Sequence, residues 1–290
     1  MTTWDGAEPP AAPPIRGWAW ARVVWRGAAL GTVTFGCLGL LLLVRLIERP
    51  IFGWHRPVTP FITQFVCRMA FIILRIRYTV RGRQMRARGA VVANHSSWLD
   101  IFTLNARKRI YFVSKSEVAT WPGIGWLARA TGTVFINRDR REAKAQSEIF
   151  EKRLKAGHKL LFFPEGTSTD GLRILPFKTT LFAAFFTDEL RDILHIQPVT
   201  VTYTAPEGQD PRFYGWWGGM NFGTHLLKVL AMEPQGGVEV VYHTPLKVSD
   251  FADRKTLAKA CEDAVRSAAP CQGSDFSAKN RVPAVSPSQG

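Results

Sequence analysis

The stretch VVANHSSWLD, residues 91–100, places a histidine and an aspartate five positions apart, at His95 and Asp100. A neutral imidazole can remove a proton near neutral pH, and a carboxylate that accepts a hydrogen bond from one ring nitrogen leaves the other nitrogen as the base. A structural explanation is equally open: His95 would be a turn residue, and Ser96 or Ser97 would cap the following helix. On an ideal helix a five-residue offset separates the two side chains. A catalytic pair therefore requires His95 in a loop and Asp100 in the first turns of the next helix.

Short β-rich runs and amphipathic segments alternate along the chain after residue 77. Strands are predicted where β-branched and aromatic residues cluster, and helices where apolar residues recur every three or four positions. The predicted strands cover residues 77–80, 90–94, 110–114, 133–137, 159–164, 196–203 and 238–243. The predicted helices lie around residues 98–106, 117–130, 140–156, 178–190 and 254–268. This order predicts an α/β fold with a mixed, largely parallel sheet flanked by helices, in which functional residues gather where strands end.

Two apolar segments precede this domain, and they predict a membrane-anchoring helical region. Residues 27–44 are uncharged and, at about 1.5 Å per residue, would extend roughly 27 Å, just enough to cross a bilayer core. A buried core helix is the alternative. Residues 61–76 carry Gln64, Arg68 and Arg75 on one stripe, which fits either a helix in the membrane interface or an ordinary packed helix.

The expected domain organisation has four parts. Residues 1–17 are rich in proline and alanine and lack an early basic region, so a disordered segment is expected rather than a signal peptide. The anchoring helices are expected within residues 18–76, and the α/β domain within residues 77–270. Residues 271–290, rich in serine, proline and alanine, are expected to form a flexible tail.

The composition indicates an anionic partner. With 38 basic and 23 acidic residues the net charge is +15, which suits a nucleic acid or a membrane surface. The 10 Trp and 19 Phe favour the membrane, because indole rings settle at the headgroup boundary. No nucleic acid is expected as a partner, because the basic residues are scattered beside apolar segments. The four cysteines lack metal-ligand spacing, so no metal site is expected.

Four blocks in the middle of the chain together resemble a known family. NHSSWLD is similar to the N-H-x4-D motif of the glycerolipid acyltransferases of the 1-acylglycerol-3-phosphate acyltransferase family. The other blocks follow in that family's order: residues 114–138, residues 162–178 with FFPEGTSTDG and PFK, and residues 196–199 with IQPV. Four blocks in order are a far more specific signal than any one of them.

The resemblance implies roles for individual residues. His95 would be the general base and Asp100 its orienting partner, with the acceptor alcohol itself as the nucleophile. Substrate binding is assigned mainly to the later blocks, on Lys115, Arg138, Glu165, Gly166 and Thr167. An arginine can hold an anionic headgroup through two parallel hydrogen bonds, and a glycine lets the backbone approach a ligand. Lys115 is explained equally well as a solvated surface lysine.

The family resemblance implies a membrane-bound O-acyltransferase that moves a fatty acyl group from an acyl carrier protein or coenzyme A thioester to a lysolipid hydroxyl. It implies no metal, nucleotide or redox cofactor. The default acceptor is 1-acyl-sn-glycerol-3-phosphate, which gives phosphatidate. A lyso-ornithine lipid is the close alternative, because many members that acylate lysophosphatidate carry arginine after FPEGT, whereas this chain has Ser168. A basic peripheral protein that binds membranes without catalysis is the alternative from a different class.

The chemistry of the donor also predicts a location. Lysolipids reside in the bilayer, whereas acyl thioesters are made in the cytosol. The protein is therefore expected at the inner, cytoplasmic membrane, with its anchoring helices in contact with anionic headgroups and residues 77–270 facing the cytoplasm.

Overall fold

The computed structural model describes residues 4–11, 13–137 and 143–269, with the backbone alone for residues 143–147. The helices are α1 (Trp18–Phe52), α2 (Thr59–Leu74), α3 (Asp100–Asn105), α4 (Ile124–Thr131), α5 (Ala143–Lys155), α6 (Phe222–Ala231) and α7 (Arg254–Ser267). The strands are β1 (Arg77–Gly82), β2 (Gly89–Ala93), β3 (Tyr111–Lys115), β4 (Val134–Ile136), β5 (Leu160–Phe162), β6 (His195–Thr204), β7 (Gly237–Tyr242) and β8 (Leu246–Lys247). The 3-10 helices are η1 (Ser116–Thr120), η3 (Leu181–Phe185) and η4 (Val248–Asp250).

The strands form one sheet in the order β1-β7-β6-β2-β5-β3-β4 within the described residues. Neighbouring strands are parallel except β6 and β7, which are antiparallel, and β8, which pairs antiparallel with β6. The predicted mixed, largely parallel sheet is therefore confirmed. Because β2, β5, β3 and β4 all run the same way, their carboxyl ends meet at one edge of the sheet.

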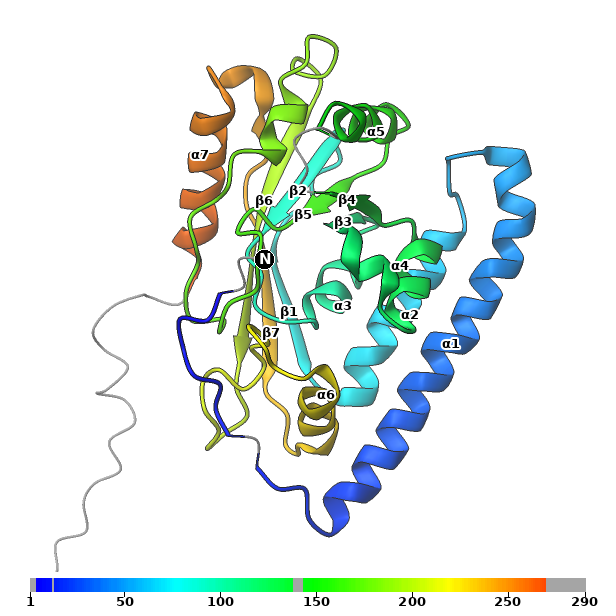
Figure 1. The fold of residues 1–290 in the computed structure, drawn as a ribbon, viewed down its shortest axis with the longest axis vertical. Helices are drawn as coiled ribbons and strands as arrows, with labels where there is room; N and C mark the ends of the chain where they lie inside the picture. Colours follow the sequence, from blue (N-terminus) through cyan, green and yellow to red (C-terminus); the bar gives the residue numbers. More distant parts are fainter. Residues whose placement is uncertain (1–3, 12, 138–142, 270–290) are drawn as a thin grey trace, which may run out of the picture.

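The sheet is covered on both faces, with α7 on one side and α1, α2, α3, α4 and α6 on the other (Figure 1). Strand β2 shows why this requires a continuous apolar run. Its alternate residues Val91 and Ala93 enter the core beneath α2 and α6, whereas Ala90 and Val92 enter the core beneath α7. A strand buried on both faces favours apolar side chains at every position, as the fully buried β2 shows.

Helix α1 is tied to the domain near both of its ends by polar side chains. Near its start, Arg22 donates to the carbonyl oxygen of Ala231 at 2.8 Å, at the last residue of α6. The buried Arg26 donates to the carbonyl oxygens of Leu230 and Met232 at 3.1 and 2.6 Å. Near its end, the buried Glu48 accepts the Val58 and Thr59 amides at the start of α2, at 2.8 and 3.2 Å. These contacts match cations to one helix C-terminus and an anion to another helix N-terminus.

Between the polar contacts near its two ends, α1 packs against the domain on one side and is exposed on the other. An added Cβ at Gly27 would lie 3.7 Å from the Leu230 side chain, and one at Gly123, just before α4, would lie 3.8 Å from the Phe35 ring. Among the described residues α1 is the one helix long and apolar enough to cross a membrane. Its outward apolar side chains include Leu40, Leu42, Leu43, Leu46 and Ile47.

Some predicted elements differ from the observed ones. The predicted helix 117–130 is split into η1 and α4, because Pro122 follows an extended Trp121 and Gly123 has a φ of 70°. The predicted helix 178–190 is reduced to η3. Helix α6 and strand β8 were not predicted.

The two ends of the chain were expected to be disordered or flexible. In the described part of residues 1–17, the Trp4 ring lies 6.0 Å from that of Trp217, and the Trp217 indole donates to the Ala7 carbonyl at 3.0 Å. This segment therefore contacts the domain, which its composition did not predict. The expected tail, residues 271–290, lies outside the described residues.

Candidate active site

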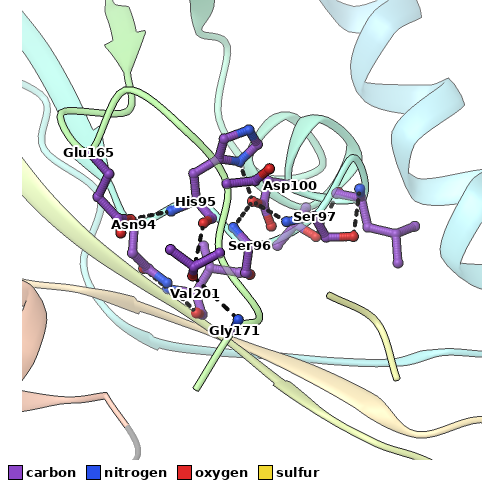
Figure 2. A network of polar contacts seen from close by, with 12 residues as sticks. Asn94, His95, Ser96, Ser97, Asp100, Glu165, Gly171 and Val201 are labelled. Atoms are coloured by element: carbon purple, nitrogen blue, oxygen red, sulfur yellow. Dashed lines mark hydrogen bonds and ion pairs between the residues drawn. The ribbon is translucent and has the colours of Figure 1, made fainter. Parts of the chain in front are cut away.

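Asn94 is the residue at which the chain leaves strand β2. Its side chain donates to the Val201 carbonyl at 2.9 Å and accepts the Val201 amide at 2.8 Å. The amide group thereby takes the place that a further backbone residue of β2 would have beside β6 (Figure 2). Because a side chain continues the pairing, the backbone is free to turn away, and His95 starts the loop at a position defined by the sheet.

His95 and Asp100 are in direct contact, with the geometry that a catalytic pair requires. His95 lies in the loop after β2, and Asp100 is the first residue of α3. The Nδ1 atom of His95 lies 2.7 Å from Asp100 Oδ2. The carboxylate is fully buried, whereas the imidazole is 21% exposed. The aspartate is thus shielded from water while the ring remains accessible.

The Asp100 carboxylate is surrounded by hydrogen-bond donors. Besides His95, the amides of Ser96 and Ser97 donate to Oδ2 at 2.9 and 3.1 Å (Figure 2). The Tyr203 hydroxyl donates to Oδ1 at 2.8 Å. Because an ionised carboxylate only accepts, the proton between His95 and Asp100 belongs on Nδ1. Nε2, on the far side of the ring from Asp100, then carries the lone pair that can act as a base.

The His95 ring and backbone are held by the segment after β5. The imidazole stacks on Phe163, with ring centroids 4.0 Å apart and planes 12° apart. The Thr169 amide donates to the His95 carbonyl at 3.0 Å. With Nδ1 bonded to Asp100 and one ring face covered by Phe163, the imidazole is fixed in a single orientation. Catalytic groups need this kind of support from their neighbours.

Glu165 holds the same loop through the backbone of His95. Its two carboxylate oxygens accept the backbone amides of His95 and Leu175, each at 2.7 Å. Burial raises the pKa of Glu165 to about 8; the two backbone hydrogen bonds oppose this rise in the pKa, and the nearby Asp100 charge adds to it. Sequence reasoning assigned Glu165 to substrate binding, whereas the structure directs both of its oxygens to the protein's own backbone.

The structure places the other sequence-predicted site residues as follows. Gly166 has a φ of 74°, which suits a glycine in the turn after β5. The Thr167 hydroxyl accepts the Trp4 amide at 3.3 Å. Lys115 ends β3 at the same sheet edge as His95 and is half-buried. Arg138 lies outside the described residues. In the part of the chain that the structure describes, no three His, Cys, Asp or Glu side chains gather as a metal site.

Sequence reasoning missed three residues that complete the site: Tyr203, Phe163 and Thr169. A signal for Tyr203 was available, because the apolar run 196–203 is longer than residues 90–94. In the structure Ala93 pairs with Val199, so β6 extends past the end of β2 and carries Tyr203 to the loop. Phe163 and Thr169 flank the PEGT block, and nothing in the sequence distinguished them from ordinary core or turn residues.

Comparison with known proteins identifies the family. A family profile described as Acyltransferase matches residues 77–202, which contain His95, Asp100 and the PEGT block. A lyso-ornithine lipid O-acyltransferase from Rhodobacter capsulatus is 64% identical over 264 residues, which are 91% of this chain and 96% of that protein. The chain belongs to the glycerolipid acyltransferase family.

This acyltransferase has further relatives of the same kind. A lyso-ornithine lipid O-acyltransferase from Brucella abortus is 37% identical over 224 residues, covering 74% of this chain and 82% of that protein. The crystal structure of PlsC, a 1-acyl-sn-glycerophosphate acyltransferase from Thermotoga maritima, matches with a TM-score of 0.59, 20% identity and coverage of 86% and 93%. That similarity supports the fold. The predicted enzyme class, an O-acyltransferase, is confirmed by the family and the named relatives.

Proposed function

We propose that this acyltransferase transfers a fatty acyl group from a thioester to the hydroxyl of a lyso-ornithine lipid. The observation that carries the proposal is the contact of the buried Asp100 carboxylate with Nδ1 of a partly exposed His95, in a chain that is 64% identical over nearly all of its length to a lyso-ornithine lipid O-acyltransferase. The geometry supports the reaction type, and the relative supports the acceptor.

In the proposed reaction His95 Nε2 takes the proton of the acceptor hydroxyl as the oxygen attacks the thioester carbonyl carbon. The new ester C–O bond forms, the C–S bond breaks, and the imidazolium returns the proton to the leaving thiolate. Asp100 stabilises the positive charge on the ring during the step. The transfer needs only the two substrates, so we propose no metal, nucleotide or redox cofactor. The donor is an acyl carrier protein or coenzyme A thioester.

The sequence favoured lysophosphatidate as the acceptor, with a lyso-ornithine lipid as the alternative; we now propose the lyso-ornithine lipid. Lysophosphatidate carries a phosphomonoester, and a tight site for it would use a fixed arginine. At the position after the PEGT block this chain has Ser168. A lyso-ornithine lipid carries a carboxylate and an amine, so it does not need a phosphate clamp. The relatives named above favour the same acceptor.

We assign headgroup contact to Lys115, Arg138 and Thr167. The assignment of Lys115 rests on its position at the end of β3, at the sheet edge where His95 and the PEGT loop also lie. Arg138 comes two residues after β4, whose carboxyl end is at that edge. Glu165 instead holds the loop, because its carboxylate is occupied by backbone amides.

We propose that the face formed by α1, α2 and α4 lies against the cytoplasmic leaflet of the inner membrane. Exposed apolar residues continue from α1 across Phe61, Phe65 and Ile72 of α2 to Trp126 of α4, which is 67% exposed. Tryptophan favours the headgroup boundary. Because the domain packs along α1 between Arg22 and Glu48, the helix fits an orientation in the plane of the membrane better than a crossing.

The test is acyl transfer by purified enzyme in detergent, with lyso-ornithine lipid and lysophosphatidate as acceptors and both thioesters as donors. We expect turnover of lyso-ornithine lipid and its loss in His95→Ala. The exposed His55→Ala is the matched control and should retain activity, since the His55 hydrogen bond to Phe52 uses only its backbone. Turnover of lysophosphatidate alone would overturn the acceptor, whereas normal turnover by folded His95→Ala would overturn the mechanism.

A further inference from the structure

The two oxygens of Asp100 have different partners. Oδ2 faces His95 Nδ1 and two backbone amides, whereas Oδ1 accepts the hydroxyl of Tyr203 at 2.8 Å. Tyr203 comes from the end of β6, 103 residues further along the chain. The sheet therefore reaches the carboxylate from the side opposite the imidazole.

A second hydroxyl, that of Thr103, lies beside the Tyr203 oxygen. Thr103 Oγ1 lies 2.9 Å from the Tyr203 oxygen and 3.0 Å from the Leu99 carbonyl. A phenol has one proton and the carboxylate accepts it, so Tyr203 donates to Asp100. The single proton of the Thr103 hydroxyl is then shared between two acceptors, the Leu99 carbonyl and the Tyr203 oxygen. Burial raises the pKa of Tyr203 well above its ordinary value, and the Asp100 charge adds to this effect. The phenol therefore stays protonated throughout the working range of the enzyme.

We propose that Tyr203 is a positioning residue for the His95–Asp100 pair, fixing the carboxylate plane and sharing its negative charge. This inference rests on the proposed role of His95 as the base. Without the phenol, the carboxylate can rotate about its Cβ–Cγ bond and lose alignment with Nδ1. In the molecules in which the pair stays aligned, the carboxylate has lost one of the donors that share its negative charge, so it stabilises the imidazolium more strongly.

These two effects predict a particular kinetic signature. Tyr203→Phe should lower kcat by about 10-fold, the size expected for one hydrogen bond to a charged group. KM for the acceptor should stay unchanged, because the hydroxyl lies behind Asp100 and away from the exposed ring face. A more strongly stabilised imidazolium holds its proton to higher pH. The acid limb of the kcat/KM profile should therefore move upward, by on the order of half a pH unit.

The other titratable groups near Asp100 and Tyr203 include Glu165, in the loop after β5, Tyr78, on β1, and Tyr214, whose ring centroid lies 5.6 Å from that of Tyr203. Glu165 interacts electrostatically with Asp100, and Tyr78 with Tyr203. Since burial raises the pKa of Glu165 to about 8, its titration can overlap the profile. The comparison must therefore be made between variants that all keep Glu165.

Tyr78 supplies the matched control. Its hydroxyl donates to the Thr103 carbonyl at 2.9 Å, so it supports the same helix without touching the Asp100 carboxylate. Tyr78→Phe removes the same atom from a neighbouring tyrosine and should leave the pH profile and kcat close to those of the unaltered enzyme. Thr103→Val, which leaves Tyr203 a weaker donor, should shift the acid limb in the same direction by a smaller amount.

The experiment measures kcat, KM and the pH profile for all three variants with the lysolipid and thioester that support turnover, together with thermal unfolding in detergent. An unchanged profile in Tyr203→Phe, or an equal loss of kcat in Tyr203→Phe and Tyr78→Phe without a shift, would overturn the proposal. If Tyr203→Phe does not fold, Thr103→Val provides the test: an upward shift of the acid limb supports the proposal, and no shift or a downward shift overturns it. Loss of activity in His95→Ala alongside a normal Tyr203→Phe would refute this inference and leave the proposed function standing.

Discussion

Glu165 shows how one residue can stabilise the site and also make it sensitive to pH. Its carboxyl is 1% exposed, and it joins the backbone of His95 to that of Leu175. An isolated carboxylate in such a place is costly to ionise. The pKa raised to about 8 expresses that cost. Because Glu165 holds the His95 amide, its ionisation also affects the loop that carries His95.

The raised pKa predicts a pH dependence of stability with a definite sign. The folded-state pKa of about 8 exceeds the ordinary value of 4.5, so the folded protein binds this proton more tightly than the unfolded chain does. The contribution of Glu165 is complete below pH 4.5 and is lost as the pH rises through about 8. Glu165→Gln cannot ionise. The thermal midpoint of the unaltered enzyme should therefore fall more steeply from pH 5 to pH 8.5 than that of Glu165→Gln.

The exposed Glu207 provides the control for this measurement. Glu207→Gln should show the same pH slope as the unaltered protein. Parallel slopes for Glu165→Gln and the unaltered protein would show that Glu165 titrates normally, and the burial argument would then be wrong.

At the scale of elements, α1 is both an apolar anchor and a part of the folded domain. The Arg26 guanidinium is 2% exposed, and it supplies donors to the end of α6 and forms an ion pair with Glu233. In Arg26→Met the apolar stem is kept, but the Leu230 and Met232 carbonyl oxygens and Glu233 each lose a donor. Glu233 keeps its ion pair with Arg75, and the Met232 carbonyl keeps the Gln235 amide. The free energy of unfolding should fall by about 2 kcal/mol and the thermal midpoint by roughly 5 °C.

Arg49→Met, at the exposed end of the same helix, is the control. It makes the same chemical change without uncovering a buried partner, so its midpoint should stay within about 1 °C of the unaltered protein. Equal midpoints for the two variants would mean that α1 is attached by its apolar contacts alone. The measurement is thermal unfolding of each purified protein in one detergent.

The elements also show what the sequence could predict. The strands β1 to β7 were predicted because β-branched, aromatic or other apolar residues cluster in each of them. Helix α6 was missed although Asn221 caps it by accepting the Thr224 amide, because its start follows a glycine- and tryptophan-rich turn that hides the period. The length of the run 196–203 was a signal for Tyr203, but its contact with Asp100 was not predictable, since the pairing of β6 with β2 brings the two residues together. The motif predicted His95 and Asp100, while their supports depend on contacts distant in sequence.

At the scale of the whole molecule, the packing of α1 predicts a membrane topology. Arg22 contacts the end of α6 and Glu48 contacts the start of α2, and both helices cover the same face of the sheet. If α1 crossed the bilayer, one of these contacts would lie on the far side. Cysteines introduced by Arg16→Cys and His55→Cys, on either side of α1, should therefore react with an impermeant maleimide from the same, cytoplasmic side.

The labelling compares inside-out with right-side-out vesicles, in a chain where Cys37 and Cys271 are replaced by alanine. Glu207→Cys, on the domain, marks the cytoplasmic side. Reaction of Arg16→Cys and His55→Cys from opposite sides would establish a crossing helix. Release of the unaltered protein by high salt would instead show that its apolar face does not enter the bilayer.

The contact between Arg26 of α1 and Leu230 of α6 also bears on the order in which the chain folds during synthesis. Arg26 leaves the ribosome long before its partner Leu230, which follows 204 residues later. At about 5–20 residues per second, that interval is roughly 10–40 s. Strand β1 is also made before its partner β7, since Arg77 pairs with Gly237. During synthesis α2 follows α1 directly and can pack against it, but the part of α1 that later contacts α6 stays uncovered. The lipid surface is therefore the first apolar surface that can bind this part of the nascent chain.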